Sequence, residues 1–125
     1  MGDHFKIASK EAVETYLKTT LAKCDNEIKK FKDRFDHERY IDAFEWADGT
    51  IEAVQMQRLC RLAADIVQEQ GTETLYDYLR DEVMLRAKWN ESSTSTCANL
   101  NSRAHIKAHA EMYDDLTRWY GMRGA

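Results

Sequence analysis

The sequence predicts an all-α fold, an antiparallel bundle of four to five helices with a long N-terminal helix, formed as one domain over residues 1–125. Apolar side chains recur at steps of three and four residues, which is the period of a helix that buries one face. The chain has no proline and only five glycines, whereas turn-rich β folds use many more of both. A chain of this length buries roughly 65% of its unfolded surface and needs no disulfide or metal to fold.

The clearest helix is expected over residues 9–35. Its apolar positions form one stripe: Val13, Leu17, Leu21, Cys24, Ile28, Phe31 and Phe35. Ser9 is a suitable N-cap, and Glu11 and Glu14 complement the positive first turn. The heptad-like spacing predicts that the whole stripe is buried, against a second long antiparallel helix.

A shorter helix is expected next, with Tyr40, Ile41, Phe44 and Ala47 on one face. Residues 48–50 have the composition of a turn, with Thr50 as the cap of the following helix. A helix that continues through Gly49 would cost only about 1 kcal/mol relative to alanine, so both alternatives stay open.

Three further helices complete the prediction. The first spans residues 51–70 and ends at Gly71, in the left-handed position that favours glycine. The second starts at Thr72 and continues to residue 89. After a polar serine- and threonine-rich loop, the last helix ends near Tyr120.

Charge and cysteine content bear on function and location. The net charge is −4, and residues 41–91 carry eleven acidic against five basic groups, which does not favour binding to nucleic acid. The three cysteines, Cys24, Cys60 and Cys97, are odd in number and form no CxxC pair. We therefore expect reduced thiols and a cytoplasmic location. No stretch is apolar enough for a membrane span or a signal peptide.

Two histidines have a spacing typical of zinc or iron ligands. His105 and His109 are four residues apart, which places both imidazoles on one helix face. No third ligand lies at motif spacing. The sequence therefore predicts no metal, no cofactor and no catalytic residues, and the histidines are interpreted as boundary residues hydrogen-bonded to their neighbours.

The acidic middle of the chain supplies the candidate binding residues. Asp42, Glu45, Trp46, Asp48 and Glu52 are predicted to face a partner, with Trp46 partly exposed. The four carboxylates would share one flank if the helix continued through Gly49. An alternative is a divalent-metal-dependent phosphohydrolase, in which these carboxylates hold magnesium opposite a second acidic helix that carries Asp77, Asp81 and Glu82.

A basic cluster suggests a third function. Lys29, Lys30, Lys32 and Arg34 surround Phe31, and such a cluster is typical of a nucleic-acid-associated subunit. Neighbouring acidic residues weaken its field, so this function is not favoured.

The sequence as a whole favours a non-catalytic helical interaction module that binds a protein partner or a second copy of itself. Proteins of this kind act as regulators, inhibitors or small subunits of larger complexes, including phage-encoded ones. The long apolar stripe and the aromatic residues support this interpretation. The sequence contains no complete set of catalytic residues that would indicate an enzyme.

Overall fold

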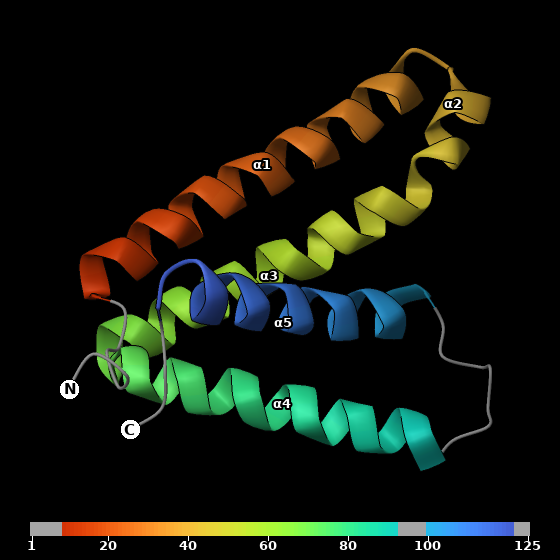
Figure 1. The fold of residues 1–125 in the computed structure, drawn as a ribbon. Coiled ribbons are helices and arrows are strands. Elements are labelled where there is room, and N and C mark those ends of the chain that lie inside the picture. The colour runs from red at the N-terminus through yellow and green to blue at the C-terminus, as the bar shows by residue number, and fades with distance from the viewer. Residues whose placement is uncertain (1–8, 93–99, 122–125) are drawn as a thin grey trace.

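The structure, a computed structural model, describes residues 9–92 and 100–121, and that part of the chain contains five α-helices and no strand (Figure 1). The helices are α1 (Lys10–Asp36), α2 (Tyr40–Glu45), α3 (Ala47–Glu69), α4 (Thr72–Ser92) and α5 (Leu100–Arg118). The predicted all-α bundle with a long N-terminal helix is thus confirmed.

The helices form two antiparallel pairs, α1 with α3 and α4 with α5. Helices α1 and α3 form a long hairpin that α2 closes, and α5 packs on α3 and antiparallel to α4 (Figure 1). The α2 end of the hairpin projects away from α4 and α5. None of the described helices combines the length and the apolar composition that a membrane span requires.

Local signals explain where the helices begin and end. The Ser9 hydroxyl accepts a hydrogen bond from the Ala12 amide at 3.2 Å, which confirms the predicted cap of α1. Gly71 adopts a φ of 100° and ends α3 as predicted, because this conformation is costly for any residue with a Cβ.

Of the two alternatives left open for residues 48–50, the structure shows the helix that continues through Gly49 and not the turn. Gly49 lies inside the first turn of α3, and the chain bends instead at Trp46, which ends α2 and precedes α3. The Thr50 hydroxyl donates to the Trp46 carbonyl at 2.9 Å, one turn back, and therefore does not act as an N-cap. One glycine in a helix costs too little to break it.

The core lies where α3, α4 and α5 meet the first half of α1. Its fully buried side chains include Val13, Val67, Leu75, Leu79, Met112 and Leu116. The prediction of a wholly buried α1 stripe is wrong. Val13, Leu17 and Cys24 are buried, but Leu21 and Ile28 are only partly buried and Phe35 is exposed. Beyond the reach of α4 and α5, the described helices that pack against α1 are α2 and α3.

We predict that Leu79→Ala lowers the free energy of unfolding by about 2–5 kcal/mol, because it opens a cavity in the core. Leu85→Ala is the matched control on the same helix, since both substitutions change helix propensity equally. Leu79 is 0% exposed and Leu85 is 57% exposed. Urea denaturation should show a loss below about 1 kcal/mol for Leu85→Ala. Equal losses of unfolding free energy in the two variants would mean that Leu79 is not part of the core.

The buried thiols give a second prediction. Cys24 and Cys60 are buried and unpaired, and Cys97 lies outside the described residues. Desolvation raises the pKa of the Cys60 thiol to about 12. The unfolded chain releases this proton near pH 8.5, so stability from Cys60 is complete below that pH and is lost as the pH rises toward 12.

Parent and Cys60→Ala should therefore differ in how their free energies of unfolding depend on alkaline pH. The parent should lose up to about 1.4 kcal/mol more per pH unit than the variant above pH ~9, measured by urea denaturation. A difference between the two proteins that stays constant from about pH 8 to 11 would contradict the assignment.

Candidate functional site

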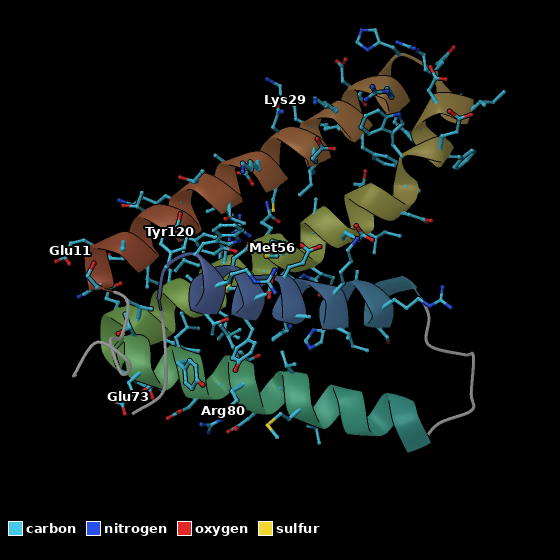
Figure 2. All side chains as sticks on the ribbon, viewed as in Figure 1. Glu11, Lys29, Met56, Glu73, Arg80 and Tyr120 are labelled. Atoms are coloured by element: carbon cyan, nitrogen blue, oxygen red, sulfur yellow. The ribbon has the colours of Figure 1, made fainter. Side chains whose placement is uncertain are left out.

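Large apolar side chains gather on the surface where α1, α2 and α3 meet. We call this surface the apolar corner, and its exposed members are Phe35, Tyr40, Ile41, Phe44 and Trp46. The side chains of Ile41 and Phe44 are 76% and 68% exposed. Side chains crowd this end of the hairpin around α2 (Figure 2). Contiguous exposed apolar groups of this kind mark interaction sites in soluble proteins.

Ring contacts hold the corner in shape. The ring centroid of Phe35 lies 5.6 Å from Phe31, 5.2 Å from Tyr40 and 6.5 Å from Phe44. The guanidinium carbon of Arg34 lies 4.4 Å from the ring centroid of Trp46, in cation–π geometry. The aromatic side chains are thus ordered by one another although the surface above them is open.

The corner is also acidic. Residues 36–48 contain five carboxylates and a single arginine, Arg39, whose Nε donates to Asp42 at 2.9 Å. Glu45 and Asp48 make no hydrogen bond or ion pair with any residue in the described ranges. Their charges therefore remain available to an external partner.

Four of the five predicted partner-facing residues lie at or next to this corner: Asp42, Glu45, Trp46 and Asp48. Trp46 is exposed, in agreement with its prediction. Glu52 is the exception, because Lys107 of α5 donates to both of its carboxylate oxygens at 3.0 Å. Sequence reasoning placed Ile41 and Phe44 on one helix face but did not predict their exposure, and so missed the most exposed members of the corner.

A cleft between α1, α3 and α5 is a second concave feature. Tyr16, Met56, Glu111 and Tyr120 are among its lining residues, and Figure 2 shows Met56 and Tyr120 turned toward the space between these helices. The Tyr16 hydroxyl donates to Asp115 at 2.8 Å, and burial raises the pKa of Tyr16 above its ordinary value.

The cleft offers little for nucleophilic chemistry. Its thiol belongs to Cys24, whose pKa is raised by burial, so this sulfur is protonated and weakly nucleophilic at neutral pH. Burial also raises the pKa of Glu111, although nearby Lys107 opposes the shift. We interpret the Tyr16–Asp115 bond as a link between α1 and α5 rather than a catalytic pair.

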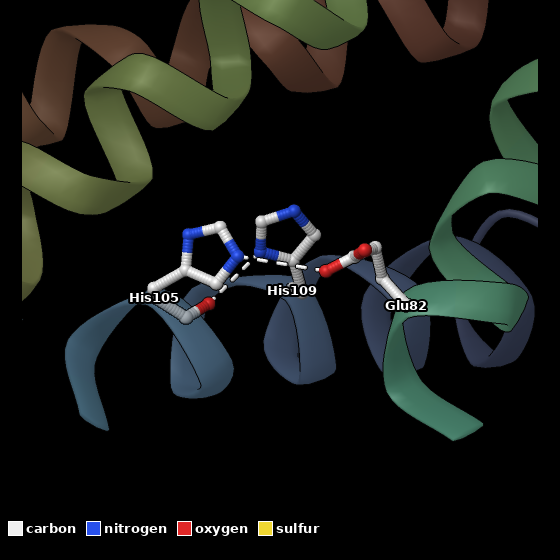
Figure 3. Close-up of side chains that lie close together, drawn as sticks. All are labelled: Glu82, His105 and His109. Carbon is white, nitrogen blue, oxygen red and sulfur yellow. Dashed lines mark hydrogen bonds and ion pairs between the residues drawn. The ribbon is translucent and has the colours of Figure 1, made fainter. Parts of the chain in front are cut away.

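The two predicted histidines meet a third potential ligand across the helix interface. Glu82 of α4 faces His105 and His109 of α5, and its Oε2 lies 3.5 Å from His105 Nε2 (Figure 3). Within the described ranges, this is the one group of three or more potential metal ligands. Sequence spacing identified the histidine pair, but Glu82 was named only as a carboxylate of the alternative magnesium site and was not connected with the histidines.

The acidic and basic clusters behind the two alternative functions are partly occupied by local ion pairs. On α4, Arg80 lies 3.4 Å from Asp77 and 3.1 Å from Asp81. On α1, Lys30 pairs with Glu27 at 3.6 Å. Neither cluster therefore presents an uninterrupted charged surface.

No protein-family model, curated protein or solved structure that was compared with the chain matches it. The functional argument accordingly rests on the corner, the cleft and the histidine cluster.

Proposed function

We propose that the protein is a non-catalytic helical interaction module that docks onto a protein partner through the apolar corner. The observation that carries the proposal is the set of large apolar side chains left in water on a preformed surface. Burying an exposed side chain such as Ile41 or Phe44 contributes about 1.5–3 kcal/mol to association. Two or three such anchors are enough to dominate an interface.

The order of the corner strengthens this proposal. An interface loses affinity when flexible side chains must be immobilised on binding. Phe35 already contacts the rings of Phe31, Tyr40 and Phe44, and Arg34 already stacks on Trp46. Docking would therefore immobilise few additional groups.

The charge of the corner indicates the chemistry of the partner. Five carboxylates against one arginine between residues 36 and 48 favour a partner whose apolar pocket has a cationic rim. A second copy of the chain would bring like charges together, so a different protein fits better than self-association. A regulator, an inhibitor or a small subunit of a complex would use such a surface.

The apolar anchors can be tested with a matched pair of double variants. A photo-crosslinking residue at position 44 would first identify the partner in the source cells, and the purified partner would then be titrated calorimetrically. Ile41→Ser with Phe44→Ser should weaken binding at least a hundredfold, with little change in melting temperature. Met84→Ser with Leu85→Ser removes two apolar groups from α4 that are 65% and 57% exposed, and this variant should bind as the parent does.

Equal affinities of the two double variants would contradict docking through the corner. A parent protein that dimerises in sedimentation experiments, and becomes monomeric in the Ile41→Ser, Phe44→Ser variant, would show that the occupant is a second copy instead.

The acidic rim gives a separate prediction. Reversing Glu45 and Asp48 to lysine should lower the association rate constant about tenfold or more at low salt and much less at high salt, because exposed charges steer encounter. The melting temperature should stay close to that of the parent, since neither carboxylate pairs with another side chain in the part of the chain that the structure describes. Stopped-flow mixing at two ionic strengths measures the effect, and unchanged rates would mean that the rim is only solvated.

A further inference from the structure

The cluster of Glu82, His105 and His109 has the composition of a transition-metal site. One potential ligand atom from each side chain lies within 4.8 Å of the other two. The imidazole centroids of His105 and His109 are 4.2 Å apart, one helical turn from each other on α5. Figure 3 shows Glu82 reaching toward them from α4.

The contact between His105 and Glu82 has the wrong length for a good hydrogen bond. His105 Nε2 is buried and makes no hydrogen bond to the described residues, and it lies 3.5 Å from Glu82 Oε2. Hydrogen bonds between nitrogen and oxygen are normally 2.7–3.2 Å long. Two ligands of one tetrahedral zinc ion, each bonded at ~2.0–2.1 Å, are separated by about 3.4 Å. The observed separation therefore suits shared coordination better than direct bonding.

The surroundings of His109 allow it to act as a ligand. Its Nε2 lies 2.8 Å from the Tyr78 hydroxyl, and its Nδ1 lies 2.9 Å from the His105 carbonyl. A hydroxyl can donate or accept, so Tyr78 can also accept a proton from Nε2–H. In the structure Nδ1 is the donor, because the His105 carbonyl oxygen can only accept. Metal binding through Nδ1, the nitrogen on the side of His105 and Glu82 (Figure 3), would move this proton to Nε2, where Tyr78 can accept it. Metal-binding histidines commonly have such a partner on the second ring nitrogen.

A second histidine–carboxylate pair shows that the distance alone is not sufficient. His37 Nδ1 lies 3.5 Å from Asp33 Oδ1, the same separation as in the cluster. Both of those side chains are largely exposed, and they belong to no group of three ligands among the described residues. The side chains of Glu82 and His105 are only 21% and 35% exposed, and His109 is buried.

We infer that Glu82, His105 and His109 bind one divalent transition-metal ion, with zinc as the ion that two imidazoles and a carboxylate suit best. Magnesium and calcium prefer sets of oxygen ligands, so this cluster discriminates against them. The ion would join α4 to α5 at their interface and stabilise their packing. This inference is independent of the proposed docking function, because none of its residues belongs to the apolar corner.

The test adds zinc or cobalt(II) to protein that has been stripped of metal with a chelator. We expect one ion per chain by calorimetry, visible absorption bands of four- or five-coordinate cobalt, and no effect of magnesium. Zinc at a hundredfold excess over its dissociation constant should raise the melting temperature by about 10 °C. Absence of any zinc-dependent stabilisation at concentrations up to ~1 mM would overturn the site.

Three variants assign the ligands. Glu82→Gln and His105→Gln should each weaken zinc binding at least tenfold and abolish the cobalt bands, and His37→Gln should bind metal as the parent does. Equal binding by all four proteins would overturn the assignment. If the first two variants fail to fold, X-ray absorption spectroscopy of the zinc-loaded parent identifies the ligands instead. Two imidazole ligands would support the site, whereas a thiolate sulfur or a single imidazole would overturn it.

Discussion

The difference in length between the helices determines which parts of the molecule have a core. Helix α1 has 27 residues and spans about 40 Å, whereas α5 has 19 residues and spans about 28 Å. Helices α4 and α5 can therefore cover only part of the α1–α3 hairpin. Where they cover it, Val13, Leu75 and Met112 are fully excluded from water. Where they do not, the apolar stripe of α1 continues onto the surface and becomes the apolar corner.

Helix periodicity explains how much of this fold could be predicted. The spacing of apolar residues identified α1 and its Ser9 cap, and Gly71 marked the end of α3, because these signals are local in the chain. The exposure of Phe35 could not be predicted in the same way. Periodicity shows which side chains share a face, but it does not show whether another helix is long enough to cover that face.

The same distinction between local and long-range signals applies to the residues of the candidate sites. Asp42, Glu45, Trp46 and Asp48 are close in sequence and lie together at the corner, whereas Glu52, one turn beyond Asp48 on α3, pairs with Lys107 of α5. The spacing of His105 and His109 shows that they share a face of α5. Glu82 joins them only through the packing of α4 on α5, which no local pattern encodes.

The hydrogen bond between Tyr16 and Asp115 joins residues 99 positions apart and has a consequence for the order of folding. During synthesis the α1–α3 hairpin leaves the ribosome before α5 does, so the apolar groups that α5 later covers are exposed to water in the meantime. Closure of the first helix against the last is the step with the largest loop entropy. The nascent hairpin is therefore the species most open to chaperone binding or aggregation.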